Sequence, residues 1–176
     1  MAYADHFRLV DDVAVHFDGV VASVDPFLQS RYVGFYAVAA AAVMELAVKE
    51  IMIEYAKAHH PLFGEYCRAR YERINGRVGF DDLCKEHLKS FGSRPLKTFK
   101  RIVRFVDYWH LKHKGYSVKK AYENLLTCRH AFAHEGHVPE QTAYSDIKQS
   151  FESGKIMLAC LAKALRMKRT NVSKEQ

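Results

Sequence analysis

The stretch RYVGFYAVAAAAVME, residues 31 to 45, decides the fold of this chain. No residue from Tyr32 to Met44 is charged, and the alanine run allows other helices to pack closely against this segment. The apolar pattern extends over about residues 26 to 58, which predicts a helix about 50 Å long. Asp25-Pro26 marks its start, because aspartate is a good N-cap and proline suits the first helical position. We therefore expect a central core helix that is buried on most of its faces.

A membrane span is the alternative interpretation of this apolar run. A span needs about 20 consecutive apolar residues, and Arg31 and Glu45 bracket a shorter stretch. We therefore expect no membrane partner. A carboxylate at the end of such a run is expected to be paired or to lie near the surface of a site, which makes Glu45 a candidate site residue.

The rest of the chain also has helical patterns, and no stretch alternates convincingly with period two. Proline and glycine are scarce, at 4 and 9 residues, which favours helices over a turn-rich sandwich. The further helices are expected at about 3–24, 61–75, 80–92, 94–113, 117–135 and 143–168. The sequence predicts an all-α bundle with a long central helix. We expect one domain over residues 1–176, with a core at about 28–165 and a frayed basic tail at 166–176.

The positive charge of the chain is concentrated in one segment. The formal net charge is +7, yet the segment from Lys85 to Lys120 holds eleven lysines and arginines against two acidic residues. An inward stripe is expected from Phe99 to Trp109, and an opposite, basic stripe is formed by Lys97, Lys100, Arg101 and Arg104. A local excess of this kind favours a surface that tracks a nucleic-acid backbone. An ordinary solvated helix face is the other interpretation.

The cysteines stand at positions 67, 84, 128 and 160, and no two form a CxxC pair. This spacing argues against a structural zinc site and is typical of reduced, buried thiols. The N-terminal residues MAYADHF have neither a basic region nor an apolar region of the kind found in secretion signals. We expect a cytoplasmic protein.

The segment RHAFAHEG, residues 129 to 136, carries the candidate chemistry. His130 and His134 lie on one helical face at i and i+4, and Gly136 is a typical C-cap. Arg129 and His134 are about 140° apart around the helix axis. The histidines suit a zinc pair, with His137 or Glu135 as a third ligand. However, the metalloprotease pattern has a glutamate where Ala131 stands.

Two interpretations need no metal. In the first, the residues are structural, with Arg129 paired to an acid such as Glu45 and the histidines capping carbonyl groups. In the second, they cleave RNA through its own 2′-hydroxyl. Histidine supplies a base near neutral pH, and arginine supplies fork-like hydrogen bonds to the phosphorane oxygens.

An arginine, a polar residue, three variable residues and a histidine near the end of a helix resemble the motif of the HEPN superfamily. Arg129, His130, Ala131-Phe132-Ala133 and His134 match this order, and a Gly and one more amphipathic helix follow. The alanine-rich helix that contains Met-Glu-Leu, with Glu45, is similar to the helix that such domains pack beside the motif. The resemblance covers about residues 28 to 165.

The resemblance implies a small HEPN-like helical bundle that dimerises through the motif helices, so that two Arg–His sets face one cleft. It implies a metal-independent endoribonuclease without cofactor, in which Arg129 and His134 carry catalysis, His130 assists and Glu45 orients Arg129. The products would be a 2′,3′-cyclic phosphate and a 5′-hydroxyl. Related domains that bind RNA, nucleotides or proteins without cutting imply a non-catalytic module as the alternative.

The resemblance also implies a biological setting and partners. HEPN toxins that are paired with a nucleotidyltransferase usually have a tyrosine where Gly136 stands here. This departure favours the RiboL-PSP group, with a toxin or antiphage-defence role. The expected partners are RNA, a second copy of the chain, and an antitoxin or another regulatory protein.

Overall fold

The long central helix is present in the computed structural model, which describes residues 2–72, 74, 76–140 and 142–166. This helix, α2, runs over Pro26–Lys57, close to its predicted span. It begins where expected, because Asp25 Oδ1 accepts hydrogen bonds from the backbone N–H groups of Phe27 at 2.9 Å and Leu28 at 3.1 Å. The alanines of α2 are largely buried, which lets neighbouring helices pack close to its backbone. No strand occurs in the described part of the chain, so the predicted all-α class is confirmed.

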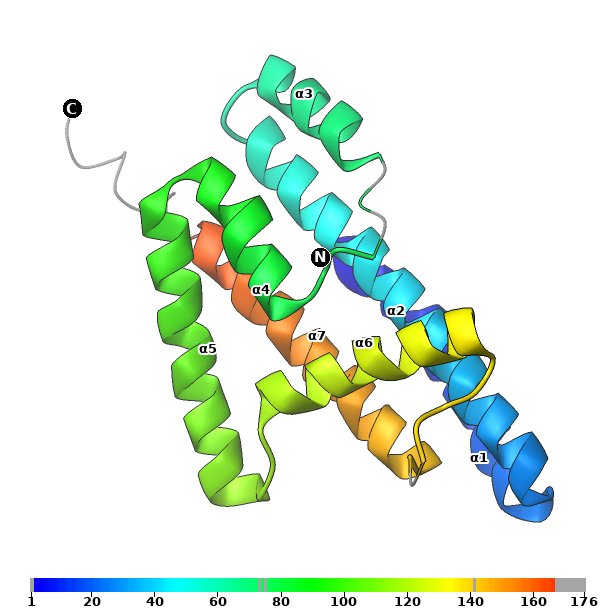
Figure 1. The fold of residues 1–176 in the computed structure, drawn as a ribbon. Coiled ribbons are helices and arrows are strands. Elements are labelled where there is room, and N and C mark those ends of the chain that lie inside the picture. Colours follow the sequence, from blue (N-terminus) through cyan, green and yellow to red (C-terminus); the bar gives the residue numbers. More distant parts are fainter. Residues whose placement is uncertain (1, 73, 75, 141, 167–176) are drawn as a thin grey trace.

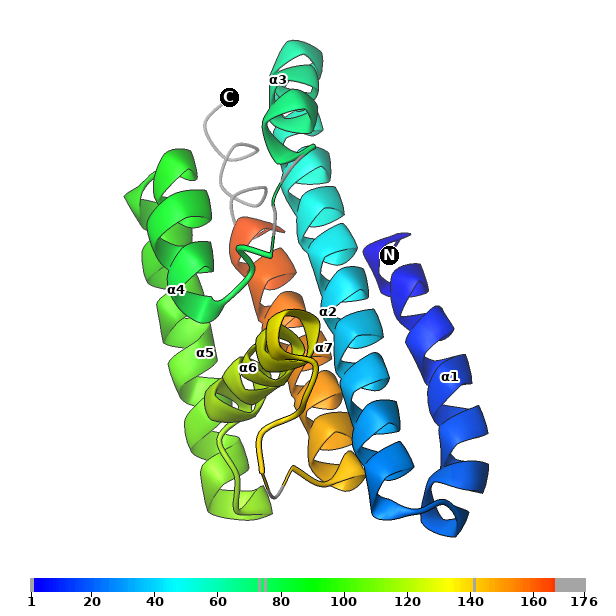
Figure 2. The ribbon, with the colours of Figure 1, turned by 45° about the vertical axis from the view of Figure 1, so that its right-hand side comes forward.

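The helices form a bundle around α2 and the C-terminal helix α7 (Tyr144–Arg166). In Figures 1 and 2, α1 (Phe7–Val20) and α5 (Ser93–Lys114) flank this central pair on opposite sides. Helix α6 (Val118–Glu135) crosses in front of the pair, and it contacts both α2 and α7. Helix α3 (Pro61–Tyr71) turns back onto the end of α2. Among the described residues, no helix is long and apolar enough to cross a membrane.

Aromatic side chains fill much of the core between these helices. Tyr36 of α2 packs edge-on against Tyr144 and Phe151 of α7, with ring centroids 5.6 and 5.9 Å apart. Tyr122 of α6 is also fully buried. All four cysteines are buried and free, as their spacing predicted. Many of the aromatic residues therefore serve the core, although others on α2, α3 and α5 are exposed, namely Phe27, Phe35, Tyr66, Phe105, Tyr108 and Trp109.

The structure differs from the predicted boundaries in three places. Helix α3 ends at Tyr71, several residues earlier than expected. The expected helix at 80–92 is divided into α4 (Phe80–Asp82), a π-helical turn η3 (Leu83–His87) and a 3₁₀ turn η4 (Leu88–Phe91). Trp109 is 43% exposed, so its prediction as an inward residue was wrong. The predicted tail, apart from Arg166, lies outside the described residues.

Short elements complete the N-terminal region. The 3₁₀ turns η1 (Ala2–His6) and η2 (Val21–Ser23) stand before and after α1. The imidazole Nε2 of His6 lies 2.9 Å from Glu50 Oε2, which connects η1 to α2. These contacts place the N-terminal region on the side of α2 away from α6, as seen in Figure 2.

Candidate active site at the end of helix α6

Helix α6 carries the RHAFAHEG segment and is fixed at both ends. At its start, Ser117 Oγ accepts the N–H of Lys120 at 3.1 Å, while Asp107 of α5 accepts hydrogen bonds from Ser117 Oγ and the N–H of Lys119. At its end, Gly136 has a φ of +74° and closes the helix as expected for a C-cap. The guanidinium of Arg31 donates a hydrogen bond to the carbonyl oxygen of Gly136. The motif is therefore held on an anchored helix.

The end of α6 lies unusually close to α2 at one point. The ring of Phe132 covers Gly34, where an added Cβ would lie only 2.0 Å from Phe132 Cδ2. The same ring packs edge-on against Phe35 at a centroid distance of 5.2 Å. The missing side chain at Gly34 is thus what lets the motif helix approach α2.

On the side facing α2, Arg129 is paired with Glu45. Arg129 Nη2 lies 3.8 Å from Glu45 Oε1, and the side chains are 33% and 19% exposed. Gly76, in the loop after α3, covers this pair with a φ of +76°; a Cβ there would lie 3.4 Å from Arg129 Nη1 and 3.5 Å from Glu45 Oε1. The fixed cation that the sequence predicted is therefore held by a carboxylate and lies under a backbone loop.

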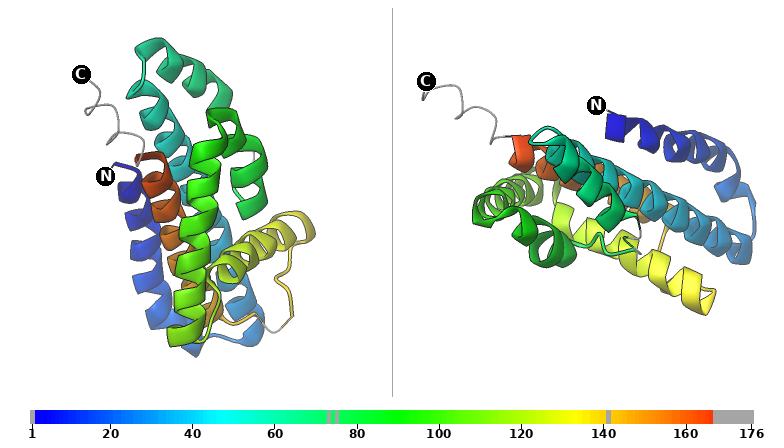
Figure 3. Two further views of the ribbon diagram at one scale, coloured as in Figure 1. Left: turned by 90° about the vertical axis from the view of Figure 1, so that its left-hand side faces the viewer. Right: turned by 90° about the horizontal axis from the view of Figure 1, so that it is seen from above.

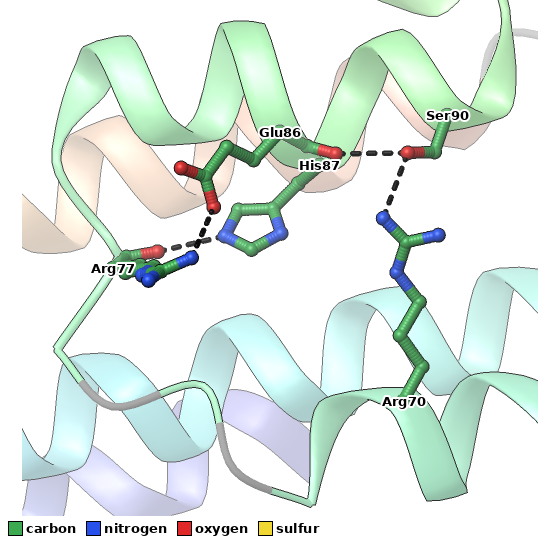
Figure 4. A network of polar contacts seen from close by, with 5 residues as sticks. All are labelled: Arg70, Arg77, Glu86, His87 and Ser90. Atoms are coloured by element: carbon green, nitrogen blue, oxygen red, sulfur yellow. Dashed lines mark hydrogen bonds and ion pairs between the residues drawn. The ribbon is translucent and has the colours of Figure 1, made fainter.

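Hydrogen bonds from α6 hold this loop in place. Tyr122 Oη donates to the carbonyl of Val78 at 2.8 Å in the buried core, and Glu123 Oε1 accepts the N–H of Phe80 at 2.8 Å. A further contact joins the loop to η3, where His87 Nε2 lies 2.7 Å from the carbonyl oxygen of Arg77 (Figure 4). Burial lowers the pKa of His87 below its ordinary value, although the bond to the Arg77 carbonyl acts in the opposite direction.

The two motif histidines lie on the other side of α6. The rings of His130 and His134 are adjacent, with centroids 4.5 Å apart, and both residues are exposed to solvent. They point away from the face that carries Phe132. In one chain, the structure thus brings Arg129 to Glu45 and His130 to His134. It does not bring Arg129 and His134 onto a common face.

The basic stripe of α5 does not lie beside the motif histidines. Lys97, Lys100, Arg101 and Arg104 are all exposed on α5. Helix α5 meets the beginning of α6, through Asp107 and Ser117, whereas the histidines stand at its end. At 1.5 Å per residue, Val118 and His134 are about 24 Å apart along the axis. Figure 1 shows the end of α6 reaching past α2, away from α5.

The groups around the motif have little capacity to hold a metal. Burial raises the pKa of Cys128, next to Arg129, to about 11, so it is a thiol at neutral pH and a poor ligand. Within the described residues, no group of three or more His, Cys, Asp and Glu side chains is arranged to hold a metal ion. The arrangement offers a fixed guanidinium and two solvent-facing imidazoles, which are groups for binding a phosphate and transferring protons.

The sequence patterns do not identify several residues of this site. Gly76 stands just beyond the helix predicted at 61–75 and was not singled out, and Arg31 was noted only as the boundary of the apolar run. Tyr122 and His87, which hold the loop over Arg129, had no sequence signal, because their partners are backbone carbonyls 44 and 10 residues away.

Comparison with protein families gives a match over most of the chain. The model of a protein family described as RiboL-PSP-HEPN matches residues 5–166. No curated protein and no solved structure matches the chain.

Proposed function

The chain belongs to the RiboL-PSP-HEPN family, and from this premise we propose that it is a metal-independent endoribonuclease. The observation that carries the proposal is the R-x4-H segment on an anchored helix, with Arg129 held 3.8 Å from Glu45. A guanidinium oriented in this way suits the charge that develops on a phosphate in the transition state. We propose Arg129, His134 and His130 as catalytic residues and Glu45 as the residue that orients Arg129.

In the proposed reaction, one histidine takes the proton of the 2′-hydroxyl, and the 2′-oxygen forms a new bond to phosphorus. The bond from phosphorus to the 5′-oxygen breaks, and a second histidine gives a proton to the leaving oxygen. The products are a 2′,3′-cyclic phosphate and a 5′-hydroxyl end. Arg129 stabilises the phosphorane oxygens, and no metal or cofactor takes part.

A homodimer is part of the proposal, because Arg129 and His134 of one chain face different sides of α6. His134 faces solvent about 140° around the axis of α6 from Arg129. The two side chains of a single copy therefore cannot easily contact the same phosphate. Two copies related by a two-fold axis at the motif helices place two Arg–His sets on one cleft. The exposed ends of the two α6 helices leave this face free for such contact.

The biological setting is also proposed. The chain acts as a single domain over residues 1–176, in the cytoplasm, as a toxin or antiphage-defence effector that an antitoxin or other regulatory partner controls. RNA beyond the scissile phosphate contacts Lys97, Lys100, Arg101 and Arg104, which are exposed. Their distance from His134 means that they hold a remote part of the substrate.

The test is incubation of the purified protein with total RNA in EDTA, beside His134→Ala and the control His137→Ala. His137 is exposed and lies just outside the motif. We expect chelator-resistant cutting that leaves cyclic-phosphate ends, persists in the control and is lost in His134→Ala. DNA stays intact, because it lacks the 2′-hydroxyl. Cutting that EDTA abolishes contradicts the proposal.

The divergence of Arg129 and His134 in one chain also favours a second candidate, a non-catalytic module that binds RNA, a nucleotide or a protein. Substitution of Arg129 and His134 distinguishes the two. The ribonuclease proposal expects Arg129→Ala and His134→Ala to abolish cutting while RNA affinity stays nearly intact. The module instead expects RNA affinity to fall in these variants, with no cutting by the unmodified protein on any RNA.

A further inference from the structure

We propose that the outward face of α5 binds single-stranded RNA, with arginines on the phosphates and aromatic rings stacked on the bases. This inference deepens the proposed function by naming the class of substrate. The face is formed by exposed residues that recur at three- and four-residue steps along α5, namely Arg94, Lys97, Arg101, Arg104, Phe105, Tyr108 and Lys112. At 1.5 Å per residue it extends for about 27 Å.

The aromatic rings of this face are among those that the bundle leaves exposed, as it also leaves Phe27, Phe35 and Tyr66. Phe105 is 70% exposed and Tyr108 is 64% exposed, and they stand on the same side of the helix as Arg101. The buried side of α5, with Phe99 and Val103, packs into the bundle instead. In the left view of Figure 3, α5 runs down the front of the molecule, and no other described element lies over it. The fold therefore leaves Phe105 and Tyr108 available to a ligand.

The charge of α5 identifies the ligand as an anion. Its only acidic residue, Asp107, is used to cap α6 through Ser117 and Lys119. Among the described residues, none of the lysines and arginines of α5 makes an ion pair with a carboxylate. Cations that have no acidic partner and alternate with rings suit a backbone of phosphates whose bases are free to stack. Paired bases do not expose their faces, which favours single strands over duplex RNA.

Two other occupants fit this face less well. A helix that lies in a membrane interface buries a continuous apolar face, whereas Arg101, Arg104 and Lys112 lie on the same exposed face of α5 as the rings of Phe105 and Tyr108. A second copy of the chain would bring two strongly basic helices together, and like charges repel at close range. Both remain as outcomes of the test below.

The position of the face limits the substrate further. Helix α5 meets the beginning of α6 through Asp107, and this point is about 24 Å along α6 from His134. An RNA that occupies both the face and the proposed cleavage site has to be unpaired over several nucleotides between them. We therefore expect cutting in long unpaired regions, and weak activity on oligonucleotides too short to reach α5.

The experiment measures affinity for an unpaired, fluorescent RNA of about 20 nucleotides. Its 2′-hydroxyls are methylated, so that binding is measured without cutting. We expect the Kd to rise about tenfold in Phe105→Ala and in Tyr108→Ala, and to stay within about twofold in Tyr108→Phe, which keeps the ring. Arg101→Gln and Arg104→Gln each lower the slope of log K against log salt by about 0.7. Tyr66→Ala, an equally exposed tyrosine on α3, serves as the matched control and leaves the Kd unchanged.

A Kd that stays within about twofold in both ring-to-alanine variants overturns the inference. The inference is also overturned if the ring-to-alanine variants keep their RNA affinity but lose binding to phosphatidylserine vesicles. It is likewise overturned if they keep their RNA affinity but change their oligomeric state in light scattering. The result is independent of the ribonuclease proposal. If the ring variants weaken binding but no RNA is ever cut, the α5 surface stands and the ribonuclease proposal fails. If His134-dependent cutting is found and the ring variants bind RNA normally, the ribonuclease proposal stands and the α5 surface fails.

Discussion

Gly76 lies against both members of the Arg129–Glu45 pair, with a φ of +76°. We expect Gly76→Ala to cost roughly 1–2 kcal/mol of stability, because a Cβ is unfavourable in the left-handed region. The strained loop also shifts the guanidinium, so the cleavage rate falls about tenfold. Thermal unfolding and initial cleavage rates measure the two effects.

Gly115 supplies the matched control for this prediction. Its φ is +77°, but a Cβ there would meet nothing within 4 Å. Gly115→Ala should lose a similar amount of stability to Gly76→Ala, while its cleavage rate should not change. If the two variants cleave equally well, Gly76 has no effect on Arg129 beyond the stability of the fold.

Single residues of the site differ in how far the sequence could predict them. The motif predicts Arg129 and His134 as site residues, and the position of Glu45 at the end of an apolar run makes it a candidate as well. Arg31 and Gly76 act on partners distant in sequence, and Arg31 is 105 residues from Gly136. No local pattern encodes such a contact, because it depends on how the helices cross.

At the scale of elements, the crossing of α6 over α2 depends on Gly34. An added Cβ would lie 2.0 Å from the Phe132 ring, so Gly34→Ala has to displace the ring or the helix. Overpacking of this kind costs about 1–3 kcal/mol. We expect that loss in denaturant unfolding, together with a lower cleavage rate, because His134 moves with α6. Gly19→Ala in α1 meets nothing within 4 Å and should be neutral or slightly stabilising.

The π-helical turn η3 makes the loop over Arg129 sensitive to pH. Burial lowers the folded-state pKa of His87, so its contribution to stability is complete above the ordinary histidine value of about 6.5. As the pH falls below that value, the unfolded chain binds a proton that the folded chain does not. The free energy of unfolding then decreases, with a slope of at most about 1.4 kcal/mol per pH unit for this group.

Denaturant unfolding of the unmodified protein and of His87→Gln, measured from about pH 7.5 to 5, checks this expectation. The variant should lose part of the pH dependence, whereas His113→Gln, at an exposed position of α5, should retain it. Identical pH profiles for the unmodified protein and His87→Gln would show that the burial of His87 contributes nothing to the acid sensitivity.

Helix ends that local chemistry determines were predicted well, as the caps at Asp25 and Gly136 show. The 80–91 segment was predicted as one helix, whereas it contains a π-helical turn whose His87 contacts the Arg77 carbonyl. A repeating apolar pattern does not distinguish such a turn from an α-helix. Trp109 was misplaced for a geometric reason. It is ten residues from Phe99, which is about 80° short of a whole number of turns, so it leaves the buried stripe.

At the scale of the whole molecule, the sequence predicts the elements but not which surfaces meet. The basic stripe of α5 and the motif of α6 are close in sequence, yet they lie at opposite ends of α6 because the helices turn sharply at Gly115. Arg129 and His134 face different sides of α6, because five residues along a helix are about 140° apart around its axis. The spacing of the motif already indicates this divergence, and the assembled bundle adds that Arg129 is paired with Glu45 while His134 faces solvent.

The proposed dimer therefore predicts how mixtures of active and inactive chains behave. If each cleft needs a histidine from both copies, a mixed dimer of the unmodified chain and His134→Ala is inactive. After the chains are mixed and allowed to exchange, cleavage should fall as the square of the unmodified fraction. The same titration with Tyr66→Ala, a surface variant on α3, should leave activity proportional to total protein. Activity that follows the unmodified fraction linearly would mean that one chain completes the site alone, and the 140° separation would then require a conformational change in α6.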